Sequence, residues 1–216
     1  MPKLLIYGTG LIAEVAEFYF RTDSAYDVVA FTNAREFIKE DTFRDRPVLA
    51  FEEIADLYPP GEHAIFVALG YAKTNKIRQG RVAEAKAKGY ACASYVSSRA
   101  LCFGEARGEN CFILENNVIQ PFVTIGNNVT LWSGNHIGHH SRIGDNCFVS
   151  SHVVISGACD IGPNCFLGVN ATIQDNIKLG SFVVVSPGAV VKRDCEERSV
   201  VQPPESTARV IPRDVI

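Results

Sequence analysis

A strict period of six residues runs through the second half of the chain. From about residue 113, aliphatic residues occupy one phase thirteen times in succession: Ile119, Ile125, Leu131, Ile137, Ile143, Val149, Ile155, Ile161, Leu167, Ile173, Leu179, Val185 and Val191. At average composition each position would be aliphatic about one time in four, which excludes coincidence. A period of six matches neither a helix nor an alternating strand. It predicts a left-handed parallel β-helix over 113–191, with three hexads in each triangular coil.

A mostly small residue stands four positions after each aliphatic residue and is expected to face the narrow interior as well. Cys147, Cys159 and Cys165 occupy this slot, so they are expected to be reduced core residues, since a buried thiol behaves as a small hydrophobe. The chain has seven cysteines and no Cys-x-x-Cys pair, which argues against a disulfide framework. The ends of such a stack need caps, here the N-terminal domain and residues 192–216.

Residues 1–95 predict a small open α/β sheet. Strands are expected at 3–7, 27–31, 63–69 and 90–95, and helices at 11–21 and 74–88, with 96–112 as a linker or an irregular first coil. The Gly8-Thr9-Gly10 turn would let a phosphate approach a helix N-terminus. The glycine-rich fingerprint of dinucleotide-binding domains has a third glycine, which is missing here. A purely structural strand-turn-helix therefore remains the alternative to nucleotide binding. His63 is expected at the surface.

Four of the five histidines lie within seventeen residues: His136, His139, His140 and His152. In the hexad Ile137-Gly-His139-His140-Ser-Arg142, both histidines face outward near a corner. An exposed imidazole suits general-base catalysis. The four could line one groove, or they could be surface or subunit-interface residues.

At these motifs the chain resembles the bacterial hexapeptide-repeat sugar acyltransferases, which include nucleotide-amino-sugar N-acetyltransferases and sialic acid O-acetyltransferases. The resemblance rests on 137–146 and on Ile161-Gly-Pro-Asn-Cys-Phe-Leu-Gly-Val-Asn170, behind a Rossmann-like α/β domain. It implies a homotrimer that transfers an acyl group from acyl-CoA, most simply acetyl-CoA, to an amino or hydroxyl group of a nucleotide-linked sugar.

The resemblance also implies roles for residues. His139 matches the base, and His140 stands where the family often has an orienting glutamate, so either Asp145 or another acidic group replaces that glutamate, or His140 shares the role. Gly157, Val169, Pro187 and His152 match the acyl-CoA groove, and a backbone N–H near Gly157 could stabilise an oxyanion. Gly8, Gly10, Asn33 and Gly70 match the nucleotide-sugar site. The family's Gly-Gly-His after the first strand is replaced here by Gly10-Leu-Ile. Its acidic residue after the second strand is replaced by Asn33. These changes leave the identity of the acceptor open.

Two other classes of function stay open. One is a non-catalytic nucleotide-sugar-binding or scaffold protein. The other is a zinc hydratase of the γ-carbonic anhydrase type, which needs three histidines around one metal, such as His136, His140 and His152; otherwise no metal is expected. A net charge of −3 without a basic block argues against nucleic acid. No stretch is long enough to span a membrane and the run at 4–7 is too short for a signal peptide, so the expected location is the cytoplasm.

Overall fold

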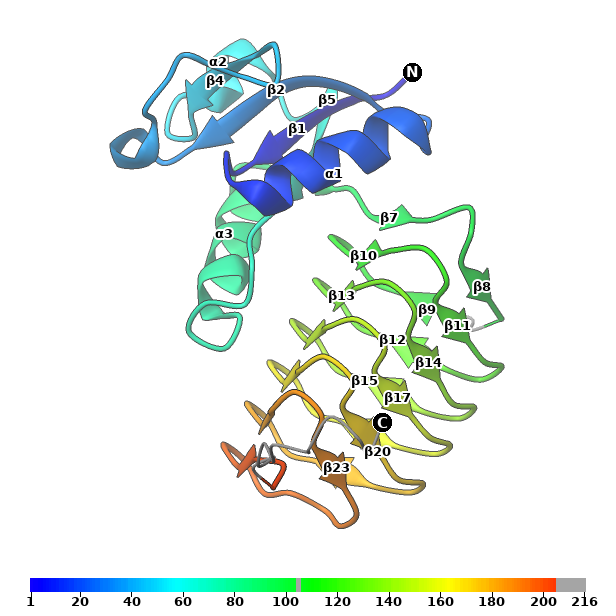
Figure 1. The fold of residues 1–216 in the computed structure, drawn as a ribbon. Coiled ribbons are helices and arrows are strands. Elements are labelled where there is room, and N and C mark those ends of the chain that lie inside the picture. Colours follow the sequence, from blue (N-terminus) through cyan, green and yellow to red (C-terminus); the bar gives the residue numbers. More distant parts are fainter. Residues whose placement is uncertain (104–105, 205–216) are drawn as a thin grey trace, which may run out of the picture.

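The computed structural model describes residues 1–103 and 106–204. An α/β domain is seated on the first coils of a triangular β-helix (Figure 1). Among the described residues, no helix has the length and apolar character needed to cross a membrane.

The α/β domain contains a six-stranded sheet in the order β3-β4-β2-β1-β5-β6. All neighbouring strands are parallel except the pair β3 and β4. The strands are β1 (Lys3–Tyr7), β2 (Asp27–Asn33), β3 (Thr42–Phe43), β4 (Arg46–Ala50), β5 (His63–Val67) and β6 (Ala91–Cys92). The helices are α1 (Leu11–Thr22), α2 (Ile54–Leu57) and α3 (Lys76–Ala87), with a 3-10 turn η1 (Arg35–Phe37).

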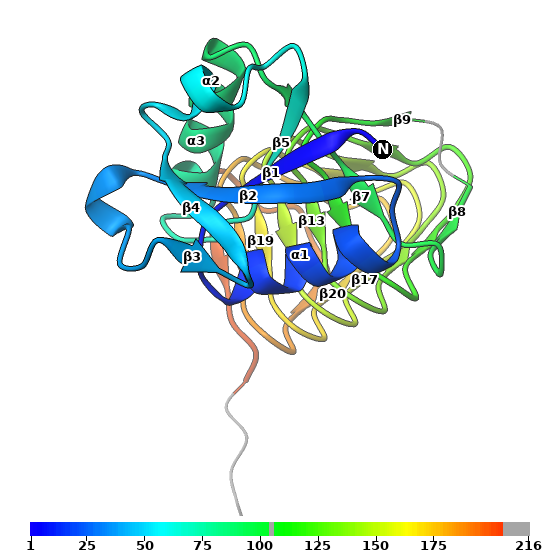
Figure 2. The same ribbon diagram turned by 90° about the horizontal axis from the view of Figure 1, so that it is seen from above.

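The helices cover both faces of this sheet (Figure 2). Ala13, Ala16 and Phe20 of α1 pack with Phe66 and the first β-helix coil on one face. α2 and α3 cover the other face, around Ile65. The expectation that His63 is exposed is wrong, because its ring lies edge-on to Tyr58 and its Nδ1 is 3.1 Å from the carbonyl oxygen of Pro59.

Three parallel sheets form the faces of the β-helix. Face 1 contains β7 (Tyr95–Val96), β10 (Phe112–Ile113), β13 (Thr130–Leu131), β16 (Phe148–Val149), β19 (Phe166–Leu167), β22 (Val184–Val185) and β24 (Val200–Val201). Face 2 contains β8 (Leu101–Cys102), β11 (Val118–Ile119), β14 (His136–Ile137), β17 (Val154–Ile155), β20 (Thr172–Ile173) and β23 (Val190–Val191). Face 3 contains β9 (Ala106–Arg107), β12 (Thr124–Ile125), β15 (Arg142–Ile143), β18 (Asp160–Ile161) and β21 (Lys178–Leu179).

The interior confirms the six-residue phase. All thirteen predicted aliphatic positions are buried, none more than 5% exposed. Cys147, Cys159 and Cys165 are buried and free, as expected. Because successive coils pair in register eighteen residues apart, as Ile137 does with Ile155, each interior side chain stacks on its equivalents.

The boundaries of the β-helix differ from the prediction. The β-helix begins at Tyr95, one coil before residue 113, and the α/β sheet closes with β6 instead. The segment predicted as a linker therefore supplies β8, β9 and β10. The six-residue phase breaks there, because Val96 and Cys102 pair with residues seventeen positions later, Ile113 and Ile119, whereas Arg107 pairs with Ile125, eighteen positions later. At the other end, β24 continues face 1, so part of the predicted cap is a further coil. Residues 205–216 of that predicted cap, and Gly104 and Glu105 of the linker, lie outside the described residues.

Most corners contain one residue with a left-handed backbone. Asparagine often occupies it, as at Asn146, Asn164 and Asn176, because asparagine tolerates positive φ better than most residues. Histidine occupies it at His140 and His152, with φ of 60° and 58°.

A strap of residues 69–79, from the end of β5 into α3, joins the two domains along the corner between faces 3 and 1. Tyr71 packs on Phe148 and Phe166. The Asn75 side chain donates to the carbonyl of Cys165 at 3.2 Å. Arg78 is 1% exposed and donates to several oxygens of the β-helix. The strap holds the α/β domain against successive coils.

Candidate active site

A pocket opens at the carboxyl ends of β1 and β2, in front of the N-terminus of α1. It has a volume of about 400 Å³ and is lined by Gly8, Thr9, Gly10, Asn33, Phe37, Lys39, Glu40, Thr42, Phe43, Val48 and Leu69. Ligands of open α/β sheets bind at this edge. The first turn of α1 has no side-chain cap, so its N–H groups can receive an anion.

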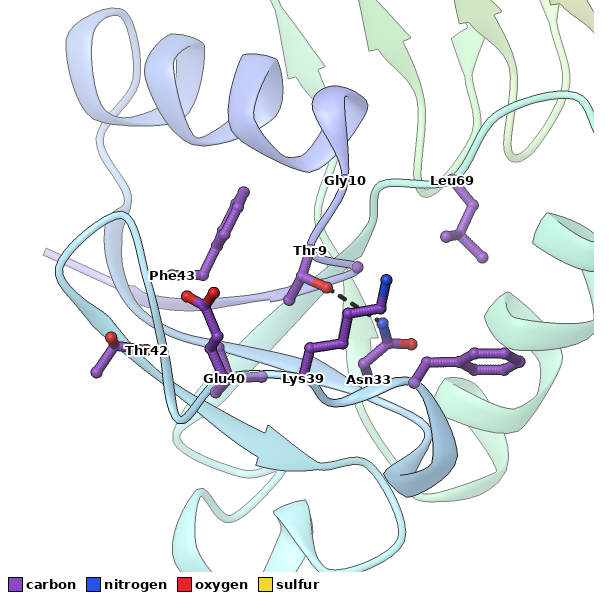
Figure 3. Close-up of a pocket in the computed structure, with 11 residues that line it drawn as sticks. Thr9, Gly10, Asn33, Lys39, Glu40, Thr42, Phe43 and Leu69 are labelled. Carbon is purple, nitrogen blue, oxygen red and sulfur yellow. Dashed lines mark hydrogen bonds between the residues drawn. The ribbon is translucent and has the colours of Figure 1, made fainter.

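Three of the four residues predicted for nucleotide binding line this pocket. Asn33 accepts the N–H of Ala34 at 3.0 Å and donates to the Thr9 hydroxyl at 3.4 Å. Figure 3 shows the Lys39 ammonium reaching toward that pair. Gly70 follows the lining residue Leu69 and lies against Ile12 of α1. Lys39 was not predicted, since it lies in the unassigned stretch 34–62.

The predicted catalytic pair lies at the corner between faces 2 and 3, after β14. His139 and His140 are both exposed. Their Nδ1 atoms are 3.1 Å apart and their rings meet edge to face. The backbone N–H of His139 donates to the side-chain oxygen of Gln120 at 2.9 Å. The pair can therefore present imidazole nitrogens to solvent from a fixed backbone.

Gly157 lies one coil after His139, directly beneath its ring. A Cβ at this position would lie 2.7 Å from Cε1 and 2.9 Å from Nε2 of His139. Only glycine leaves that space free. The Gly157 N–H itself donates to the Asp175 carboxylate at 3.2 Å, and an oxyanion donor near Gly157 stays a prediction.

The other predicted acyl-CoA residues lie at a different corner, between faces 1 and 2. Val169 is 43% exposed there, and Pro187 and His152 are exposed too. The His152 ring covers Gly134, where a Cβ would approach it to 2.7 Å. Val169, Pro187 and His152 thus form an exposed, partly apolar ridge along this corner.

One chain therefore does not bring all predicted residues together. His139, His140 and Gly157 share one corner, whereas His152, Val169 and Pro187 share another, with His136 on face 2 between them. The prediction that the four histidines line one groove is wrong for a single chain. In Figure 1 the α/β domain sits at the end of the stack and α3 runs down the side opposite the loops that leave β14.

Two further residues at the histidine corner were missed from the sequence. Gln120 fixes the His139 backbone, and Phe122 lies against the His140 ring at 4.6 Å between centroids. Counting eighteen residues back from His140 would have found Phe122 as its coil equivalent. Among the described residues of one chain, no cluster of three or more His, Cys, Asp or Glu side chains could hold a metal ion.

Comparisons with known proteins agree with this architecture. Residues 108–138, 123–157 and 158–193 match the family model of the bacterial transferase hexapeptide, described as six repeats. A comparison with curated protein sequences gives no match.

Solved structures share the whole fold. A variant of perosamine N-acetyltransferase from Caulobacter crescentus, in complex with CoA and GDP-perosamine, is 22% identical with a TM-score of 0.82, over 93% of this chain and 97% of that one. The acetyltransferase domain of PglB from Neisseria gonorrhoeae, in complex with acetyl coenzyme A, is 19% identical with a TM-score of 0.80, over 94% and 98%. WeeI from Acinetobacter baumannii is 17% identical with a TM-score of 0.57, over 91% and 94%. These matches confirm the predicted resemblance, at the level of repeat and fold.

Proposed function

We propose that the chain, whose residues 108–193 match the model of the bacterial transferase hexapeptide family, is an acyltransferase that moves an acetyl or other short acyl group from acyl-CoA to an amino or hydroxyl group of a nucleotide-linked sugar. The observation that carries the proposal is the exposed His139–His140 pair above the bare backbone of Gly157. The relatives with CoA, acetyl coenzyme A and GDP-perosamine in their structures support it.

The acceptor's nucleotide would bind in the pocket of the α/β domain. Gly8, Gly10 and the N-terminus of α1 would face its phosphates, with Asn33 and the neighbouring Gly70 around them. Lys39 adds a positive charge on the pocket wall.

Acyl-CoA would lie along the ridge at the corner between faces 1 and 2. The residues there fit its pantetheine chain, because Val169 and Pro187 offer apolar contact beside the exposed His152 ring. Since this ridge and His139 lie on different corners of one chain, we propose a homotrimer in which the ridge of one copy faces the histidine corner of the next.

His139 would act as a general base. Its imidazole takes a proton from the acceptor amine or hydroxyl, whose nitrogen or oxygen then forms a bond to the thioester carbonyl carbon. The carbon–sulfur bond breaks, and the CoA thiolate leaves and receives the proton from the imidazolium. A positioned base of this kind contributes about 10²–10⁴-fold in rate.

A thiol-release assay with acetyl-CoA and a panel of GDP-, UDP- and dTDP-linked amino sugars tests the proposal. We expect thiol release that depends on one of the acceptors. Acyl-CoA binding without turnover of any acceptor would favour the non-catalytic alternative. Light scattering tests the assembly, and a mass equal to one chain would refute the trimer.

A further inference from the structure

The ring of His139 has one hydrogen-bonding partner in the described part of the chain, and that partner is another imidazole. The two Nδ1 atoms are 3.1 Å apart, with ring centroids 5.2 Å apart and planes at 86°. At this distance the two nitrogens share one hydrogen, so one ring donates and the other accepts.

The acidic residues that could orient His139 are engaged elsewhere. Asp145 lies at the corner between faces 3 and 1, where its carboxylate accepts the Asn127 N–H at 2.7 Å. Asp175 accepts the N–H of Gly157. Among the described residues, no carboxylate forms a hydrogen bond or ion pair with either histidine. The sequence left open Asp145, another acidic group or His140, and among the described residues only His140 forms a hydrogen bond with the His139 ring.

His140 is held in place by its backbone and by an aromatic neighbour. Its φ of 60° is left-handed, as at most corners of this β-helix, so the repeating corner fixes the backbone of this residue. Its N–H donates to the carbonyl of Pro121 at 3.3 Å, and its ring lies against Phe122. The imidazole is thus fixed from two sides before it meets His139.

We propose that His140 is a positioning residue that sets the tautomer of His139. His140 Nδ1 accepts the hydrogen on His139 Nδ1, so His139 keeps an unprotonated Nε2, on the edge of the ring that borders Gly157. That lone pair takes the proton from the acceptor. When His139 becomes an imidazolium, its Nδ1–H still donates to neutral His140, as it would to a carboxylate. This inference rests on the proposed function only for its kinetic consequence.

The tautomer can be measured without any substrate. In protein labelled with ¹⁵N-histidine, long-range ¹H–¹⁵N correlation spectra distinguish Nδ1–H from Nε2–H imidazoles, and a His139→Gln variant assigns the signals. We expect His139 to carry its hydrogen on Nδ1 in the native protein, and to lose this preference in His140→Ala. A native His139 protonated on Nε2 would overturn the proposal.

Two variants at position 140 separate the hydrogen bond from the backbone. Alanine and asparagine already occupy the equivalent position in later coils, as Ala158 with φ of 57° and Asn176 with φ of 61°. Both should therefore fold at residue 140. Asparagine offers a side-chain oxygen as an acceptor, whereas alanine offers none.

We expect His140→Ala to lower kcat by about 10- to 100-fold, the loss typical when the partner that fixes an imidazole is removed, with KM for acyl-CoA and the melting temperature nearly unchanged. His140→Asn should recover a large part of kcat. Equal kcat for wild type and His140→Ala would refute the positioning role while leaving the acyltransferase proposal standing. An asparagine variant no better than alanine would refute the acceptor role. If the wild type transfers no acyl group, the function proposal fails, and the tautomer spectra alone then test whether His140 positions His139.

Discussion

Replacing Arg78 with methionine should lower the free energy of unfolding strongly. Arg78 nevertheless lies neither in the proposed nucleotide pocket nor on the proposed acyl-CoA ridge. Its guanidinium donates to the carbonyl oxygens of Asn128, Asn146 and Cys147 at 3.0, 3.3 and 3.1 Å. It also donates to the side chains of Asn128 and Thr130. Burial lowers the pKa of Arg78 to about 10, so it is still charged at neutral pH. No carboxylate among the described residues neutralises it.

The magnitude follows from which acceptors lose their partner. The Cys147 carbonyl still accepts the Thr130 N–H, and the Asn128 side chain still accepts from Asn110. The buried carbonyl of Asn128 and the partly buried carbonyls of Asn146 and Leu69 have no hydrogen bond in the described structure except the ones from Arg78. Each buried, unpaired carbonyl costs about 1–3 kcal/mol. The expected loss in free energy of unfolding is therefore about 2–6 kcal/mol.

Arg81→Met on the same helix is the matched control. Arg81 pairs with Glu84 at 2.5 Å near the surface, and such a pair contributes about 0–1 kcal/mol. Urea unfolding at fixed protein concentration, followed by the fluorescence of the single tryptophan, Trp132, measures both variants. If Arg78→Met loses no more stability than Arg81→Met, the reasoning about the buried strap is wrong.

Three other predictions can be checked directly. Gly157→Ala should push the His139 ring aside and lower kcat by about 10²–10⁴-fold with little change in melting temperature; full activity would contradict the packing at this corner. The three inward cysteines should resist thiol reagents until unfolding because all three are buried in the β-helix interior, and burial also raises the pKa of Cys147 and of Cys159; rapid labelling of the native protein would disprove this. Hydrogen bonds from the Tyr95 hydroxyl and the Ser98 N–H lower the pKa of Asp23. Its contribution to stability is therefore present above the unfolded pKa of about 3.9 and lost as pH falls through the lower folded value, so the destabilisation caused by Asp23→Asn should vanish in strong acid; an equal effect at pH 7 and in acid would contradict it.

The α/β domain was predictable only in part. The expected strand at 3–7 and the start of the helix at 11 agree with β1 and α1, because an apolar run and helical spacing mark them. Residues 34–62 contain β3, β4 and α2, which were not predicted. These elements are two to five residues long, too short for periodicity to register. The missed pocket residue Lys39 lies in this stretch.

The candidate site was predictable as a set of residues but not as an arrangement. The hexad phase places His139 and His140 outward and Gly157 one coil below, and the structure agrees. Their contacts join residues of neighbouring coils, His139 with Gln120 nineteen residues before it and His140 with Phe122 eighteen residues before it. The roles of these residues in catalysis and binding stay predictions.

The sequence by itself determined the β-helix, because each coil contacts only the coils before and after it, and a local repeat then specifies the whole stack. It also determined which side chains face the interior, since an aliphatic residue every six positions must stack on its equivalents. Only the tertiary structure decided where the α/β domain sits. The strap that holds it uses a buried arginine whose acceptors are mostly backbone carbonyls, and a backbone carbonyl is present at every residue, so it leaves no mark in a sequence. The same is true of the histidine pair, where a distance of 3.1 Å between two Nδ1 atoms depends on a left-handed corner and not on the order of the residues alone.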